Sequence, residues 1–307
     1  MITELTAEQY KALGFTPMHC YNLTDFVALN AGKVQCVHYL AWFDHEKLWA
    51  TLILGEDEDS LRSPFSAPFG GFDCLHLPTD EMVETIFSDL KVFASGKGKN
   101  LFITLPPPFY SSTIYSFAVR AMNDPSITVT ADYNFHYTTA DAPEYDLHLP
   151  RSARRNLRLA NEAGFHFQLV MDEEKKKEVY EVIRRNREAL GYPLRMTFNQ
   201  VMDTSRIVNA DFFLLRDNEK NPVAAAICFH AATGIVQLIY WGELLEYRRL
   251  HPMSLLAMHL FRHYYEAGIT IVDVGPSSTD GIPNRGLCAF KQNIGCRMTP
   301  KFRLKIT

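Results

Sequence analysis

The sequence predicts a two-domain α/β protein whose mixed, mostly antiparallel sheets are flanked by helices. The chain has 307 residues, which is long for one hydrophobic core and comfortable for two. Hydrophobic residues make up 47% of the chain and charged residues 21%, a balance typical of well-packed globular proteins. Strand-like apolar runs alternate with helical patterns, and we expect domains at residues 1–146 and 147–307.

The first half begins its sheet with a hairpin. VQCVHYLAWF and KLWATLILG are rich in β-branched and aromatic residues, and Asp44, His45 and Glu46 separate them. A helix should follow Thr79, which can cap its N-terminus and precedes apolar residues at helical spacing. The strand LFITL and a second helix-like stretch come next. We interpret TTADAPEYDLHLP as a crossing strand or linker into the second half.

The second half opens on a basic helix, RSARRNLRLANEAG. Its arginines recur at i, i+3, i+4 and i+7, so one helix face carries Arg151, Arg154, Arg155 and Arg158. A strand and two helices should follow, and then a three-strand meander of DFFLLRD, PVAAAICFH and GIVQLIYWG. The apolar helix MSLLAMHLFRHYYEAG, the strand ITIVDVG, the helix-like LCAFKQNIG and a last strand complete the half. This is the element order of the GNAT acyltransferase fold.

Three segments of the second half resemble the Fem peptidoglycan aminoacyl-transferases. RSARRNLRLANEAG resembles their basic helix, ITIVDVGPSS a strand end, and GLCAFKQNIG a terminal GLxxFKxxFG motif. SPFSAPFGG in the first half is a weaker match. The resemblance implies tandem GNAT-like domains, of which the N-terminal copy is degraded. It also implies transfer of an acyl or aminoacyl group to a primary amine, such as a cell-wall precursor or peptide.

One loop departs from ordinary GNAT enzymes. Those enzymes offer glycine-rich backbone N–H groups to the coenzyme A pyrophosphate at a helix N-terminus. Here the matching stretch is RRLHPM, which lacks glycine, and Pro252 has no N–H to donate. The side chains of Arg248, Arg249 and His251 could bind an anionic donor instead. The donor is therefore either acyl-CoA or aminoacyl-tRNA, and no cofactor beyond it is firmly implied.

The resemblance also implies where catalysis would occur. GNAT enzymes use a backbone N–H as oxyanion donor where their fourth strand splays from the fifth, which corresponds here to GIVQLIYWGEL. Tyr240 and Trp241 should therefore line the site, unless they only pack the sheet. Lys291 would hold the leaving group or a phosphate, although a helical lysine is usually solvated. Glu243 or Asp273 would orient or deprotonate the amine, although strand-end acids more often cap turns.

Other residues are expected to bind substrate or donor. Ser277 and Phe290 lie in the matched segments, and the four-arginine helix face suits phosphate. A solvated face paired with acids is the alternative. His259 and His263 share a helix face, but Leu260 stands where a zinc protease has its glutamate, so no metal is implied.

Charge and composition narrow the partners. The net charge of −4 gives no overall attraction to nucleic acid, so tRNA would need a local basic surface. Six scattered cysteines, an acidic N-terminus and the absence of a long apolar run indicate a cytoplasmic protein without membrane insertion. An amine acceptor is expected, and the oligomeric state stays open. The competing hypothesis is a catalytically silent GNAT-like module that binds a phosphorylated or peptidic ligand.

Overall fold

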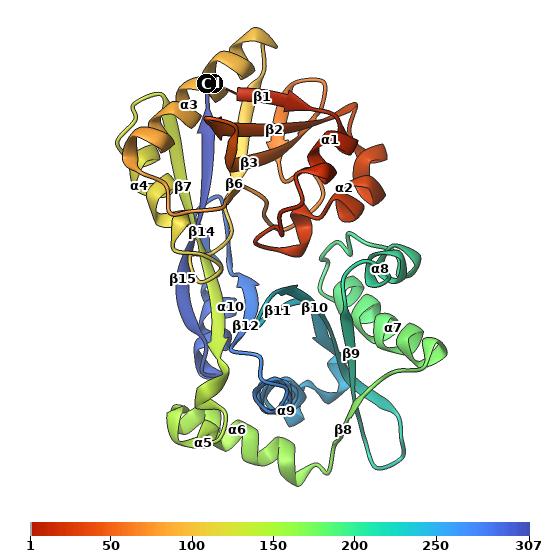
Figure 1. Ribbon diagram of the computed structural model, residues 1–307. Coiled ribbons are helices and arrows are strands. Elements are labelled where there is room, and N and C mark those ends of the chain that lie inside the picture. The colour runs from red at the N-terminus through yellow and green to blue at the C-terminus, as the bar shows by residue number, and fades with distance from the viewer. Residues whose placement is uncertain (1) are drawn as a thin grey trace. The chain divides into compact units, whose positions relative to one another are not determined.

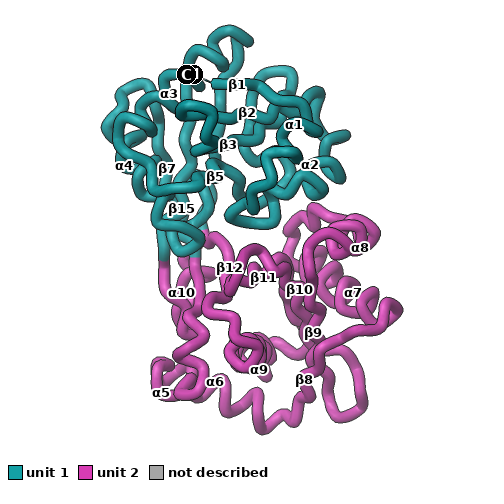
Figure 2. The backbone as a smooth tube through the Cα atoms, in the orientation of Figure 1, with its two compact units in different colours: residues 1–134, 278–283, 299–307 teal, residues 135–277, 284–298 magenta. Residues whose placement is uncertain are grey.

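The chain divides into two compact units in the computed structural model, which describes residues 2–307 (Figure 1, Figure 2). Unit 1 comprises Met1–Asn134, Ser278–Pro283 and Thr299–Thr307, and unit 2 comprises Phe135–Ser277 and Asn284–Met298. Two long strands, β7 (Ile127–Thr138) and β15 (Arg297–Ile306), contribute residues to both units. The division at residue 147 stays a prediction about the two GNAT-like halves, while the compact units have discontinuous boundaries because of these strands.

Unit 1 is built on a mixed sheet with helices. Its hydrogen-bonded strand order is β1-β2-β3-β4-β6-β15-β7, and β5 pairs with β3. The strands other than β7 and β15 are β1 (Ile2–Leu5), β2 (Cys36–Asp44), β3 (Lys47–Glu56), β4 (Ser60–Ser63), β5 (Phe72–Cys74) and β6 (Asn100–Thr104). The helices are α1 (Ala7–Ala12), η1 (Cys20–Asn22), α2 (Thr24–Asn30), η2 (Ala31–Lys33), α3 (Asp80–Gly96) and α4 (Thr113–Met122), and β13 (Ser278–Thr279) pairs with β14 (Ile282–Pro283).

Local sequence explains the first elements of unit 1. The predicted hairpin is confirmed, since β2 and β3 pair antiparallel and turn at His45 and Glu46, both with positive φ. Thr79 caps α3 as predicted, because its side chain accepts a hydrogen bond from the Met82 N–H. The apolar faces of α3 and α4 pack on the sheet around a stacked pair of rings, Phe72 and Phe117.

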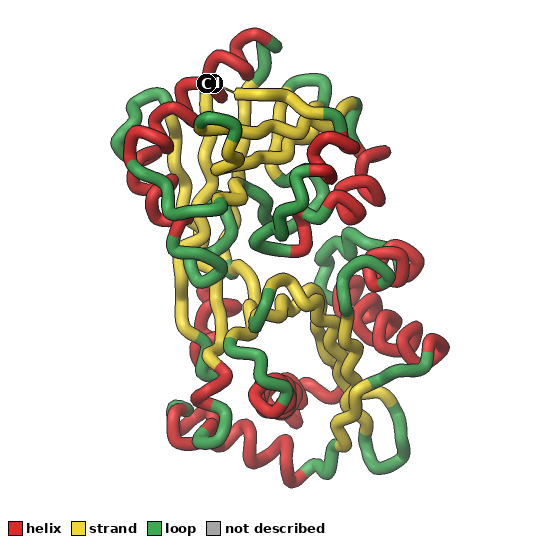
Figure 3. Tube along the Cα trace, in the orientation of Figure 1, coloured by secondary structure: helices red, strands yellow, loops and turns green. Residues whose placement is uncertain are grey.

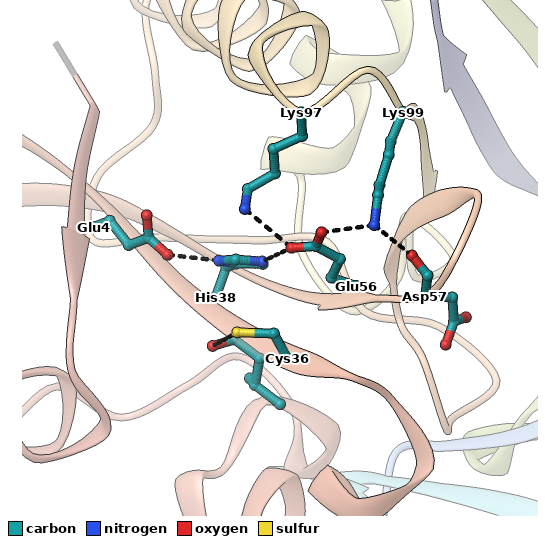
Figure 4. A network of polar contacts seen from close by, with 8 residues as sticks. Glu4, Cys36, His38, Glu56, Asp57, Lys97 and Lys99 are labelled. Atoms are coloured by element: carbon teal, nitrogen blue, oxygen red, sulfur yellow. Dashed lines mark hydrogen bonds and ion pairs between the residues drawn. The ribbon is translucent and has the colours of Figure 1, made fainter.

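A network of charged side chains, the Glu56 network, ties together three strands and the end of α3 (Figure 4). Its members are Glu4, His38, Glu56, Lys97 and Lys99. The His38 ring lies between two carboxylates, 2.5 Å from Glu4 and 2.6 Å from Glu56. Hydrogen bonds from Lys99 and Lys97 lower the pKa of Glu56 to about 2. The Glu56 carboxylate therefore has two ammonium groups beside it.

Unit 2 is built on a mixed sheet with helices on both of its faces (Figure 3). The strands of its sheet, in hydrogen-bonded order, are β12 (Ile271–Pro276), β11 (Ile235–Glu243), β10 (Pro222–Ala232), β9 (Ala210–Arg216) and β8 (His166–Leu169). The helices are η3 (Thr139–Asp141), α5 (Tyr145–His148), α6 (Arg151–Glu162), α7 (Glu173–Ala189), α8 (Phe198–Ser205), η4 (Leu245–Leu250), α9 (Pro252–Glu266) and α10 (Arg285–Asn293). The three-strand meander predicted from sequence is confirmed as β9, β10 and β11.

The core of unit 2 forms between the sheet and α9. Leu256, Leu260 and Phe261 of α9 are buried against alternate residues of β11 and β12. Gly268, with φ of +74°, follows the helix end as the sequence predicted. The α7 helix packs on β10 and β11. The predicted α/β architecture, with mostly antiparallel strands flanked by helices, is thus confirmed.

The segment TTADAPEYDLHLP differs from its prediction. It was expected to be a crossing strand or linker, but it forms η3 and α5 after β7. The reason is tertiary packing, because Ala142 and Tyr145 are buried in the core of unit 2 and the Tyr145 hydroxyl donates to the Ile294 carbonyl. The prediction used the proline and acid content of the segment, which is typical of an exposed segment, and this content gives no information about the buried contacts.

Candidate functional site

The end of β11 departs from its neighbour β12 inside unit 2. The parallel register pairs Ile235–Gln237 of β11 with Ile271–Asp273 of β12. Among the described residues, Leu238–Glu243 and Val274–Pro276 have no register partner in each other; we call these two strand ends the strand fork. The register between β10 and β11 also shifts, because Cys228 pairs with Leu238 and Ile227 with Tyr240, which leaves Ile239 as an extra residue. Such bulges re-aim backbone groups and are common beside active sites.

A buried polar pair closes the base of the strand fork. Asp273 is fully buried and accepts hydrogen bonds from the Gln237 side chain at 2.8 Å and from the Gly275 N–H at 3.0 Å. Gln237 is its register partner on β11. Asp273 was predicted as a site residue, whereas Gln237 was missed. The signal that could have identified Gln237 is a single amide side chain in the otherwise apolar run GIVQLIYWG. Burial of an amide costs free energy unless the amide is hydrogen-bonded.

Lys291 holds the β12 side of the strand fork. Its buried ammonium donates to the carbonyls of Val274, Gly275 and Pro276 at 3.0, 2.8 and 3.0 Å. The Phe135 ring lies 5.6 Å away. Three carbonyls match the three donors of an ammonium group. The lysine therefore fixes the backbone at the end of β12.

Ser277 follows this backbone segment directly. Ser277 is 2% exposed, and its hydroxyl has no hydrogen-bond partner among residues 2–307. The Ser277 carbonyl accepts from the Asn284 N–H, which connects β12 to the start of α10. A buried hydroxyl without a partner is unusual in a folded protein. Ser277 and Lys291, two of the predicted residues, are thus brought together by β12 and α10.

The β11 side of the strand fork carries aromatic side chains that point in two directions. Trp241 is half-buried, and its ring centroid lies 5.6 Å from that of Phe290 on α10. Tyr240 instead lies under Arg187 of α7, whose guanidinium is 5.8 Å from its ring. Burial raises the pKa of the Tyr240 hydroxyl, against hydrogen bonds with the backbone of Met196 and Arg195. Only Trp241 joins Phe290 to form an apolar wall.

Glu243 ends β11 as a buried carboxylate paired with an exposed arginine. Arg248 Nε donates to its carboxylate at 2.9 Å, and Asn186 donates to its backbone carbonyl at 2.7 Å. A Cβ added at Gly242 would lie 2.5 Å from the Asn186 side chain, so this close approach requires glycine. Asn186 is a second residue that the sequence analysis missed, because its role depends on a contact 57 residues away.

The stretch RRLHPM forms η4 and the start of α9. His251 adopts a left-handed conformation with φ of +53°, and Pro252 takes the first helical position. Arg249 is exposed, while Arg248 is shared with Glu243. The segment is a 3-10 helix with cationic side chains in place of a glycine-rich nest. Binding of an anionic donor by Arg248, Arg249 and His251 stays a prediction.

The four predicted arginines of α6 share an exposed face. Arg151, Arg154 and Arg155 form no ion pair within residues 2–307, and Arg158 lies 3.6 Å from Glu162. The α6 helix packs against α9 and touches η4. The arginines of α6 and η4 therefore belong to adjoining elements, and Arg248 links η4 to Glu243 at the end of β11.

No helix within residues 2–307 has the length and apolar character needed to cross a bilayer. In the same part of the chain, no three His, Cys, Asp or Glu side chains gather in a way that could hold a metal ion.

Comparison with known proteins gives one family match and several solved structures of similar fold. Residues 149–291 match the family described as Acetyltransferase (GNAT) domain. The crystal structure of FemX has a TM-score of 0.69 at 13% identity, with 100% of this chain and 97% of FemX covered. A conserved protein of unknown function from Bacteroides thetaiotaomicron has a TM-score of 0.64 at 9% identity, with 100% and 99% covered. No curated protein sequence matches the chain.

A third solved structure is a tandem GNAT protein from the clavulanic acid biosynthesis pathway. Its TM-score is 0.54 at 10% identity, with 99% of this chain and 97% of that chain covered. At these identities the likeness concerns the fold. The tandem GNAT-like architecture and the resemblance to Fem proteins predicted from sequence are confirmed at that level.

Proposed function

We propose that the chain is an N-acyltransferase that moves an acyl or aminoacyl group onto a primary amine. The match of residues 149–291 to the GNAT domain family and the fold shared with a tandem GNAT protein support this proposal. The observation that carries this proposal is the strand fork, with its bulge at Ile239 and its buried base at Gln237 and Asp273. Backbone N–H groups of β11 beyond the last rung paired with β12 are the proposed donors to the oxyanion, the feature that acyl transfer requires.

Each side chain of the fork has a proposed role. Trp241 and Phe290 form the apolar wall against which the acyl group packs. Lys291 is a positioning residue that acts through the β12 backbone, because its ammonium already donates to three carbonyls. Ser277 offers its hydroxyl to the donor or acceptor. Glu243 and Tyr240 hold η4 and the α7–α8 segment in place.

The proposed donor carries phosphate groups and is bound mainly by side-chain cations. The arginines of η4 and the exposed face of α6 supply these cations on adjoining elements. A glycine-free loop is a weak nest for a coenzyme A pyrophosphate. We therefore favour aminoacyl-tRNA as donor, in line with the fold shared with FemX, and keep acyl-CoA as the alternative.

A transfer assay tests the proposal. The purified chain is incubated with labelled acetyl-CoA or with a set of aminoacyl-tRNAs, and with primary amines that include peptides and nucleotide-linked cell-wall precursors. We expect label to move to an amine from one donor class. Trp241→Ala should reduce the rate at least tenfold, whereas Tyr265→Ala, which removes an exposed ring from α9, should not.

The arginine faces allow a sharper test of the donor. Reversing charge with Arg154→Glu and Arg155→Glu should weaken a tRNA donor and flatten its salt dependence, because fewer counterions are released on binding. The same variants should leave a small amine acceptor unaffected. Transfer from acetyl-CoA alone would overturn the tRNA donor and keep the acyltransferase.

The glycine-free η4 also favours a second candidate, a silent module that binds a phosphorylated or peptidic ligand. Under that alternative, a phosphorylated acceptor would raise the melting temperature while every donor failed to do so and no label moved. A melting-temperature shift by any donor, together with transfer, would exclude it.

A further inference from the structure

The last residues of β7 in unit 2 lie beside β12 in a register that the hydrogen bonds define. The Thr139 N–H, just after β7, donates to the carbonyl of Thr270, just before β12, at 3.0 Å. The two strands are hydrogen-bonded neighbours. They must run antiparallel, because β7 ends where β12 begins. Counting three residues back along β7 and three forward along β12 from that hydrogen bond places His136 opposite Asp273, and the Asp273 charge acts on the His136 ring.

Strand alternation places both side chains on the same face of the sheet. Phe135 and Tyr137 of β7 pack in the core with α9, as do Val272 and Val274 of β12. Successive side chains of a strand point to opposite faces, so His136 and Asp273 point away from that core. Gln237 lies between two residues that face α9 and is in register with Asp273, so its side chain also points away from that core.

These three residues form a cross-strand row, the polar row, at the base of the strand fork. Directly opposed side chains on neighbouring strands have Cβ atoms about 5 Å apart. Asp273 and Gln237 are buried, whereas His136 is only half-buried. The row thus presents an imidazole backed by a fully buried carboxylate, and the carboxylate is fixed by Gln237 and the Gly275 N–H.

We propose that His136, oriented by Asp273, is the general base that removes a proton from the acceptor nitrogen during acyl transfer. This inference rests on the proposed acyltransferase function and names a residue that neither the sequence analysis nor the family resemblance indicated. The polar row occupies the last paired rung before the strand fork, where the acyl carbon would meet the amine.

The electrostatic surroundings suit this role. Burial lowers the pKa of His136, the Asp273 charge opposes that shift, and the Arg297 charge adds to it. His136 is therefore neutral at neutral pH and can accept a proton. Asp273 lies on β12 and Arg297 on β15.

The proposed step balances without an oxidant or reductant. The amine nitrogen forms a bond to the acyl carbon, and the carbonyl electron pair moves to the oxygen. His136 takes the proton from the nitrogen. The oxygen pair then returns, and the bond to the donor oxygen or sulfur breaks with its electrons on the leaving atom. The leaving atom takes up a proton, and the imidazolium releases one to solvent.

The test compares His136→Asn with a matched control, His259→Asn. His259 is also half-buried in unit 2, and burial also lowers its pKa, but it stacks on Phe167 rather than facing a carboxylate. We expect His136→Asn to lower kcat about 100-fold and to remove the acid limb of the pH–rate profile. His259→Asn should retain both rate and profile.

A second measurement keeps the inference testable if His136→Asn does not fold. Histidine NMR titration of the wild-type protein and of Asp273→Asn reports the pKa of His136 without activity. Loss of the carboxylate should lower that pKa further, and an unchanged value would overturn the pairing.

The outcomes separate this inference from the proposed function. If the wild type transfers an acyl group and His136→Asn does so with an unchanged rate and pH profile, the base is wrong and the acyltransferase stands. If the wild type transfers no acyl group from any donor, both are overturned.

Discussion

The Glu56 network of unit 1 and the polar row of unit 2 both place a histidine beside carboxylates within a sheet, but their surroundings differ. In unit 1, two lysines and His38 surround Glu56, so charges of opposite sign lie beside one another. In unit 2, amide donors fix the buried Asp273, and the row borders strand ends that do not pair with each other. The two clusters contain similar residue types. We assign the Glu56 network to stability and the polar row to the candidate site, because the polar row borders the strand fork.

The largest effect that the comparison predicts is for Lys291→Met. Removing the ammonium leaves the carbonyls of Val274, Gly275 and Pro276 without their buried donor. We expect a loss of about 4 kcal/mol in the free energy of unfolding, since each unsatisfied buried group costs about 1–3 kcal/mol. Urea unfolding measures this, with the exposed Lys305→Met as the control.

A stable Lys291→Met protein that had lost transfer would contradict the positioning role. That result would favour direct contact between the ammonium and the leaving group, as the Fem resemblance implied.

A smaller effect is predicted for Asp73 in unit 1, which accepts hydrogen bonds from the Met18 N–H and the Asn22 side chain. Burial raises its pKa to about 6. The folded state then favours the protonated form, so this stabilisation is complete below about pH 4 and disappears as pH rises through about 6. Relative to Asp73→Asn, the wild type should lose about 3 kcal/mol between pH 4 and pH 7.

Urea unfolding of both proteins across that pH range measures the difference. A wild-type advantage that stayed constant with pH would show that Asp73 is ionised throughout that range.

The smallest effect is predicted for Glu56→Gln. The pKa of Glu56 is lowered to about 2, so its contribution is present above about pH 4.5 and disappears as pH falls through about 2. We expect a loss of about 1 kcal/mol at neutral pH, the upper range for partly exposed ion pairs. The exposed Glu58→Gln should lose nothing.

The transfer activity of Glu56→Gln should equal that of the wild type, because the Glu56 network is assigned to stability alone. A drop in kcat at unchanged stability would give unit 1 a functional role and break the distinction between the two clusters.

Patterns within one segment were predictable from the sequence, and pairings between segments were not. The hairpin, the Thr79 cap and the arginine face of α6 follow from turn chemistry, capping and helical spacing. The GLCAFKQNIG motif located Lys291 but could not show that its donors meet the β12 carbonyls. Gln237, Asn186 and His136 were missed because their roles depend on strand register and on contacts with distant elements. The α5 helix was missed because buried tertiary contacts outweighed its local composition.

Amide hydrogen exchange with and without the acyl donor tests the central claim, that the strand fork of unit 2 binds the acyl group. We predict that the donor which supports transfer slows exchange at Leu238–Glu243 and at Val274–Ser277, while the β2–β3 hairpin of unit 1 exchanges as before. Protection confined to unit 1, or donor binding without protection at the strand fork, would contradict the account.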